Sequence, residues 1–233
     1  MTPELAKKYA APVPRYASYP TTPHFSPHVD HDAYATWLSA LRDDEPLSLY
    51  VHIPFCDSLR WYCGCTTKAI RRYDPVATYV KPLLAEIENV GRRRNQEVSH
   101  VHWGGGSPNI LEPAHILSLA DALHVRFEIA QRAEFAVEID PRRLDAERIS
   151  AFVQAGVTRV SLGVQDFDEH VQEAIVRHQS FSDTKKAADL IRDAGVRSIN
   201  IDLVYDLPHQ TCDSVAKTIN QVLALDPDRT AGV

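Results

Sequence analysis

The sequence lacks the features that mark several large classes of protein. Its 233 residues contain no run near the roughly 20 apolar residues needed to span a bilayer, and no apolar signal core follows Met1. We therefore expect a cytoplasmic protein that does not bind a membrane. A basic excess is also missing, because 25 Lys and Arg residues stand against 31 Asp and Glu residues. Nucleic-acid binding, which needs a basic surface, is not expected.

Cysteine is scarce, and its placement is the strongest signal in the composition. Of the four cysteines, Cys56, Cys63 and Cys65 lie within ten residues, while Cys212 is remote. A secreted disulfide framework would spread its cysteines along the chain and would come with a signal peptide. In a reducing compartment, such a cluster predicts metal binding or redox chemistry.

From residue 47 onward, short apolar segments alternate with amphipathic ones. Strands are predicted at 47–53, 97–103, 133–140, 157–164 and 196–205, separated by segments with helical spacing. This alternation predicts an α/β fold with a parallel sheet, either doubly wound or an open (β/α) barrel. Residues 1–46 hold several prolines and one helical segment from His31. We therefore expect an irregular N-terminal segment at 1–46 and a core at 47–233.

Every predicted strand ends in polar or glycine-rich sequence, which is where parallel sheets bind ligands. The cysteine loop follows the first strand, and HWGGGSPN ends the second. Glu138, Gln165 and Asp202 lie at the ends of the next three strands. The triple glycine is neither a Gly-Lys-Ser/Thr phosphate loop nor a G-x-G-x-x-G dinucleotide fingerprint. The pattern predicts a ligand site at the carboxyl ends of the strands.

Seven ordered motifs resemble those of a known family, the oxygen-independent coproporphyrinogen III oxidases, which use radical S-adenosylmethionine (SAM) chemistry. They are RYASYPTT, YVHIPFC, WYCGC, HWGGGSP, EIDPR, SLGVQDF and NIDLVYDLP. RYASYPTT and the CGC ending indicate the oxidase branch rather than the related haem chaperones. The resemblance implies a partial (β/α) barrel of radical SAM type. After DRTAGV we expect the family's last strand and C-terminal domain to be missing.

The resemblance implies a reaction and its cofactors. In this family, two propionates of coproporphyrinogen III are oxidatively decarboxylated to vinyl groups, giving protoporphyrinogen IX. The implied cofactors are a [4Fe–4S] cluster and one or two SAM molecules, one of which chelates the open iron through its amino and carboxylate groups. The implied partners are the small-molecule substrate and an electron donor, and we expect a monomer. No residue of this chain is predicted to be catalytic.

The cluster motif departs from the family pattern at one position. Cys56 and Cys63 match the first and third ligands, but the second position holds Arg60. A guanidinium stays protonated and offers no lone pair to iron, so the site is one ligand short. Cys65 is the extra cysteine of the oxidase pattern and is a further candidate ligand. The sequence therefore predicts either an inactive chain or an altered site.

Other positions match residues that hold SAM in the family. Those around the cleaved SAM are Tyr50, Gly105 and Glu138; those around a second SAM are Tyr62, Gly106, Ser107, Gln165, Arg177 and Asp202. Asp206 stands where the family has glycine, so the turn there is a second departure.

Two other functions fit parts of the sequence. One is a non-catalytic protein that keeps affinity for SAM or porphyrin without radical chemistry. The other is a zinc-binding α/β protein that uses the three clustered cysteines and a histidine, although their C-x₆-C-x-C spacing is unlike common zinc motifs.

Overall fold

The computed structural model describes residues 4, 24–26, 28–58, 60–94 and 96–232. The chain divides into two compact units, Met1–Leu41 and Arg42–Val233. In the first unit, helix α2 (His31–Ala40) is capped by Asp30, whose carboxylate accepts hydrogen bonds from the backbone of Asp32 and Ala33. This confirms the helical segment predicted from His31. The motif RYASYPTT lies outside the described residues, and the predicted boundary at residue 46 stays a prediction.

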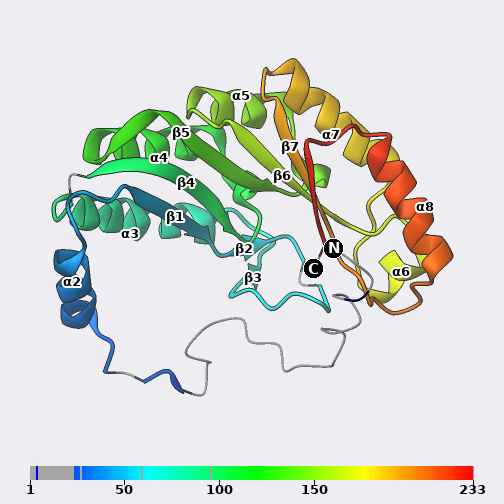
Figure 1. Cartoon of the computed structure of the whole chain (residues 1–233), viewed down its shortest axis with the longest axis horizontal. Helices are drawn as coiled ribbons and strands as arrows, with labels where there is room; N and C mark the ends of the chain where they lie inside the picture. The colour runs from blue at the N-terminus through cyan, green and yellow to red at the C-terminus, as the bar shows by residue number, and fades with distance from the viewer. Residues whose placement is uncertain (1–3, 5–23, 27, 59, 95, 233) are drawn as a thin grey trace. The chain divides into compact units, whose positions relative to one another are not determined.

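The second unit is built on a parallel sheet of six strands in the order β1-β4-β5-β6-β7-β8 (Figure 1). The strands are β1 (Leu47–Ile53), β4 (Glu97–Gly105), β5 (Glu128–Ile139), β6 (Arg159–Gln165), β7 (Ser198–Leu203) and β8 (Arg229–Gly232). All five strands expected from the sequence are present, and every neighbouring pair is parallel. A small second sheet pairs β2 (Phe55–Cys56) with β3 (Lys68–Ala69) in the cysteine loop.

Strand β8 corrects an expectation from the sequence. The residues of DRTAGV were expected to end short of a sixth strand, but Arg229–Gly232 pair in parallel with Asn200–Leu203. Asp228 sets this pairing, because its backbone N–H donates to the carbonyl of Ile199 and its carboxylate accepts the N–H of Ile199 at 2.8 Å. A run of only four residues that includes Ala231 and Gly232, both disfavoured in strands, carries little signal of its own, so the neighbouring strand decides its conformation.

The helices cover the outer face of the curved sheet (Figure 1). They are α3 (Asp74–Gly91), α4 (Pro113–Arg126), α5 (Ala146–Gln154), α7 (Phe181–Asp193) and α8 (Cys212–Leu223), with the short α6 (Glu169–Ala174) beyond the end of β6. A doubly wound sheet would carry helices on both faces, so the partial barrel is the observed alternative. No described helix combines the length and apolar character needed to cross a membrane.

Two helix boundaries show different end geometries. Helix α3 begins at Asp74, and Tyr73 takes the N-cap position without a side-chain capping bond. Gly156 lies beyond the end of α5 with φ of +94°, the left-handed conformation that glycine adopts readily after a helix.

Strand alternation separates the core from the site. In β6, Val160, Leu162 and Val164 are buried among the helices, whereas Ser161 and Gly163 point to the other face. The core formed in this way contains fully buried Trp103, Phe152 and Ile201. The inner face is left with polar and small side chains near the carboxyl ends of the strands.

Candidate functional site

A pocket of about 140 Å³ lies at the carboxyl ends of the central strands. It brings together nearly all of the predicted site residues, namely Cys56, Tyr62, Cys63, Cys65, Gly105, Gly106, Ser107, Glu138, Gln165, Arg177 and Asp202. These residues come from five strands (β2, β4, β5, β6 and β7) and three loops that are far apart in the sequence. Tyr50 is the exception, since it is 58% exposed and does not line the pocket. The ring of Tyr50 stacks on His102 at 5.7 Å.

Glu138 is fixed by two neighbours at the end of β5. Its Oε1 lies 3.1 Å from Nε2 of His102, and its Oε2 accepts the backbone N–H of Gly105 at 3.3 Å. A Cβ at Gly104 would lie only 2.7 Å from Oε1, so any other residue there would displace the carboxylate from this position. The triple glycine therefore lets the backbone approach the carboxylate, and further lone pairs of Glu138 remain available for hydroxyl groups of a ligand.

Asp202 lies on β7 and also lines the pocket. Its carboxylate accepts hydrogen bonds from Oγ of Ser161 at 2.7 Å and Nδ2 of Asn200 at 2.6 Å. Burial raises the pKa of Asp202, the two hydrogen bonds oppose this, and the nearby charge of Glu138 raises the pKa further. Two acidic side chains thus stand at one side of the pocket.

Arg177 enters the pocket from the loop after α6. It is only 3% exposed, and its guanidinium donates to the carbonyl of Gly163 and to Oε1 of Gln179 at 2.9 Å. Its Nη1 lies 3.3 Å from the hydroxyl of Tyr62. Burial lowers the pKa of Arg177 most strongly among its causes.

A buried glutamine network holds this loop and was not predicted. Gln172 donates to the backbone carbonyls of Asp166 and Gln179, and its amide oxygen accepts the N–H of Gln179. The side chain of Gln179 also donates to Thr184 at 2.9 Å. Buried amides need such partners, but the sequence alone does not report which glutamines are buried.

Arg60 is the side chain that most changes the site. Its Nη2 lies 2.6 Å from Oδ2 of Asp140, and the two side chains are 9% and 5% exposed. Asp140 also accepts two hydrogen bonds from Arg142, at 2.9 and 2.6 Å. Arg60 therefore does not turn out to solvent; it lines the pocket beside the cysteines.

Asp140 is a site residue that the sequence reasoning missed, although it lies in the quoted motif EIDPR. Burial would raise the pKa of Asp140, but the hydrogen bond from Arg142 and the charges of Arg177, Arg142 and Arg60 hold it far below its usual range. Its backbone is fixed by Asn109, whose side chain bonds the N–H and the carbonyl of Asp140.

The cysteines lie in the same pocket but differ in environment. Cys56 is buried, with Oγ of Ser107 at 3.8 Å from its sulfur. Desolvation, and then the charge and hydrogen bond of Cys63, raise the pKa of Cys65 to about 11. Cys65 is therefore a protonated thiol at neutral pH and a weaker ligand than a thiolate.

The donor set of this chain does not fit a cluster held by three thiolates. Cys56 and Cys63 occupy the first and third family positions, and the second position presents the cation of Arg60. Within the described ranges, no three His, Cys, Asp or Glu side chains are placed to hold a metal ion. The zinc alternative, which needs a histidine beside the three cysteines, therefore gains no support. The ligand roles of the cysteines stay predictions.

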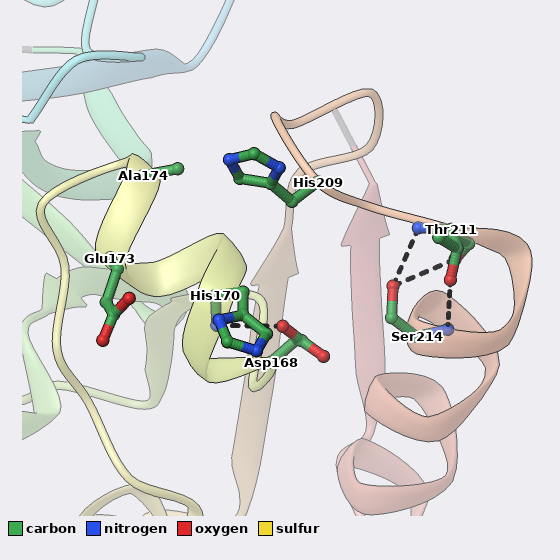
Figure 2. Close-up of a pocket in the computed structure, with 7 residues that line it drawn as sticks. All are labelled: Asp168, His170, Glu173, Ala174, His209, Thr211 and Ser214. Carbon is green, nitrogen blue, oxygen red and sulfur yellow. Dashed lines mark hydrogen bonds between the residues drawn. The ribbon is translucent and has the colours of Figure 1, made fainter.

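A wider pocket of about 600 Å³ lies between α6 and the start of α8 (Figure 2). Asp168 caps α6 by accepting the backbone N–H groups of His170 and Val171. Thr211 and Ser214 form a reciprocal capping box at the start of α8. These polar groups serve the helix ends, and no predicted site residue lies there.

The chain matches known proteins over most of its length. The model of the radical SAM superfamily matches residues 50–222. The oxygen-independent coproporphyrinogen III oxidase of Bradyrhizobium diazoefficiens is 48% identical over 234 residues, covering 98% of this chain and 52% of that protein. The protein of the same name from Paracoccus denitrificans is 45% identical, covering 96% of this chain and 50% of that protein.

Solved structures show the same relationship. Coproporphyrinogen III oxidase from Escherichia coli, described as a radical SAM enzyme, superposes with a TM-score of 0.87 at 36% identity, covering 98% of this chain and 51% of that one. A radical SAM methyltransferase from Kitasatospora setae, with a TM-score of 0.54 at 17% identity, covers 79% of this chain and 35% of that one and shows the fold alone. The chain spans about half the length of the curated relatives it matches.

Proposed function

Since the chain belongs to the radical SAM superfamily, whose members use a [4Fe–4S] cluster and SAM, we propose that it is the SAM-binding core of an oxygen-independent coproporphyrinogen III oxidase. Two observations support the proposal. All of the predicted SAM residues except Tyr50 line one pocket, and the chain is 48% identical to such an oxidase. The substrate class is a porphyrinogen whose propionates lose carbon dioxide. An electron donor, a monomeric state and a cytoplasmic location remain predictions.

The pocket offers a defined set of contacts to SAM. Glu138 accepts hydrogen bonds from the ribose hydroxyls, because its carboxylate is fixed by His102 and Gly105. Asp202 supplies a second acceptor in the same pocket. Arg177 supplies a cation that pairs with a carboxylate. These roles require binding only and involve no bond cleavage.

In the form with Arg60, we propose that the chain binds SAM but does not assemble the family's cluster. The pocket has two family-position thiols and a buried guanidinium where the third thiol belongs. The radical reaction is therefore a property of the family and not of this chain as it stands. The alternative of a non-catalytic SAM-binding protein is included in this proposal.

Anaerobic reconstitution with iron and sulfide tests the cluster half of the proposal. The chain should retain well under the roughly four irons of an intact [4Fe–4S] cluster, and Arg60→Cys should raise the count toward that value. Arg72→Cys adds a thiol at an exposed position outside the pocket and controls for adventitious iron. A full cluster in the unaltered chain would overturn this half.

Equilibrium dialysis with SAM tests the binding half. Glu138→Ala should weaken SAM binding about tenfold, because it removes a charged acceptor for hydroxyl groups. Glu147→Ala changes an exposed glutamate in the first turn of α5 and should leave the affinity unchanged. The absence of SAM binding by the unaltered chain would reject the proposed function.

A further inference from the structure

Three guanidinium groups surround one buried carboxylate in the pocket. Arg60 and Arg142 each place Nη2 at 2.6 Å from Oδ2 of Asp140. The charge of Arg177 acts on the same carboxylate. Three formal positive charges therefore face one negative charge on this side of the site.

Two of these cations have donors without an acceptor. The Nε atoms of Arg60 and Arg177 are buried and make no hydrogen bond. Both side chains are more than nine-tenths buried, so water does not readily replace the missing acceptor. A buried donor without a partner is unfavourable, and a movement of the side chain that brings the donor to a ligand oxygen restores the lost bond.

The other acids of the pocket do not neutralise this side. Glu138 is engaged by His102 and Gly105, and Asp202 is engaged by Ser161 and Asn200. The excess of positive charge on the basic side affects the pKa of Arg177. Burial lowers the pKa of Arg177, and Arg60 and Arg142 lower it further, while Tyr62 and Asp140 raise it.

The pocket is therefore divided into an acidic side, suited to hydroxyl groups, and a basic side, suited to a carboxylate. SAM carries both kinds of group, since it joins a ribose to an α-amino acid. In the family pattern, the iron left open by three thiolates holds the amino-acid end. Here the set of cluster ligands lacks its second cysteine, and the guanidinium of Arg60 occupies that position.

We infer that Arg60, together with Arg177, holds the carboxylate of SAM directly, so that this pocket binds SAM without iron. A guanidinium can donate two parallel N–H bonds to one carboxylate, and its charge strengthens both. The inference rests on the proposed function, and it places Arg177, which the resemblance assigns to a second SAM, on the same SAM molecule whose ribose Glu138 binds. It makes Arg60 a ligand-binding residue rather than only a damaged cluster position.

Metal-free binding of three adenosyl compounds tests this inference. The chain is treated with chelator, and dissociation constants are measured calorimetrically for SAM, decarboxylated SAM and 5′-methylthioadenosine. SAM and decarboxylated SAM differ only in the carboxylate, while 5′-methylthioadenosine lacks the amino-acid end altogether. The unaltered chain should prefer SAM over decarboxylated SAM by about tenfold to hundredfold.

The matched variants are Arg60→Met and Arg72→Ala. Arg60→Met keeps much of the side-chain volume and removes the charge, and Asp140 retains its bonds from Arg142. It should lower the preference for SAM over decarboxylated SAM about tenfold, with Arg177 still in place, and leave 5′-methylthioadenosine binding unchanged. Arg72 is an exposed arginine paired with Asp74, and its removal should change none of the three dissociation constants.

Each outcome has a distinct meaning. Equal binding of SAM and decarboxylated SAM by the unaltered chain overturns the inference but leaves the proposed function standing. An undiminished preference in Arg60→Met also overturns it, as does a loss in that variant that is equal for all three compounds. Failure of the unaltered chain to bind any of the three rejects the proposed function itself.

Discussion

Asp140 shows how one side chain can organise a site without being an obvious part of it. It is buried, its backbone is held by Asn109, and its carboxylate receives hydrogen bonds from Arg60 and Arg142. A carboxylate in this position is stable only because the surrounding cations compensate its desolvation. The same carboxylate keeps the guanidinium of Arg60 inside the pocket.

Asp140→Asn should destabilise the chain by about 3–5 kcal/mol, because it leaves buried guanidinium groups without their counter-charge. The free energy of unfolding, measured by urea titration, checks this. Asp121→Asn, on the exposed face of α4, is the matched control and should change the value by less than about 0.5 kcal/mol. Equal stability of the two variants would show that the ion pairs contribute nothing.

The low pKa of Asp140 also predicts a pH dependence. Because the folded-state pKa lies below the unfolded-state value, the folded chain binds fewer protons, and the stabilisation is present above the ordinary Asp range. It should be lost as the pH falls below about 4 toward the depressed value. Acid titrations of unfolding free energy should therefore be less steep for Asp140→Asn than for the unaltered chain. Parallel curves would contradict this assignment.

At the scale of elements, the connection between α6 and α7 carries Arg177 on a strained turn. Val176 has φ of +56°, a left-handed conformation that is costly for a β-branched residue. The turn is held by the Gln172 and Gln179 network and by the bond from the N–H of Arg177 to the carbonyl of Gln172 at 2.8 Å. The strain is thus maintained by contacts that orient Arg177.

Val176→Asn should stabilise the chain by about 1 kcal/mol, since asparagine tolerates this conformation and Val176 is 44% exposed. The thermal midpoint should rise by about 2–4 °C. Val125→Asn, at a still more exposed valine in helix α4, provides the comparison and should give no rise. A fall in the midpoint for Val176→Asn would mean that the left-handed turn is not strained.

The pairing of β7 with β8 offers a second prediction at this scale. Asp228→Ala removes the acceptor of the Ile199 N–H and should cost about 1–3 kcal/mol. Asp228→Asn keeps an acceptor oxygen and should cost less. The urea midpoints of the two variants give the comparison, and equal losses would show that the hydrogen bond does not set this pairing.

At the scale of the whole molecule, the core belongs to one of the two units. Every buried residue that the structure describes lies between Val51 and Leu225, and helix α2 contains none. The second unit, Arg42–Val233, therefore contains its own hydrophobic core. No residue that the structure describes in the first unit, Met1–Leu41, is buried.

A chain of residues 42–233 should keep the thermal midpoint of the full chain within about 2 °C, because no described core residue is removed. It should also keep the affinity for SAM, since every pocket residue lies within it. Circular dichroism melting and equilibrium dialysis test these two expectations. A midpoint lower by 5 °C or more would show that residues 1–41 stabilise the second unit.

Much of the fold could be predicted because the strands are short apolar runs with clear ends. The five predicted strands and the helices between them are present, with boundaries shifted by a few residues. Strand β8 could not be predicted, because Arg229–Gly232 gain their conformation from β7 and not from their own side chains. The buried glutamines near Arg177 were also missed, since burial of a polar side chain depends on distant segments.

The sequence by itself determined the parallel α/β core, the residues at the strand ends and the absence of the second cluster cysteine. These features follow from local periodicity and from the identity of single residues. The tertiary structure alone decided where Arg60 goes. Its guanidinium pairs with Asp140, 80 positions away in the chain, because the strand end that carries Asp140 and the cysteine loop meet at one edge of the sheet. Spatial proximity of this kind arises only from folding. As a result, the position of the second cluster cysteine holds the buried positive charge of Arg60.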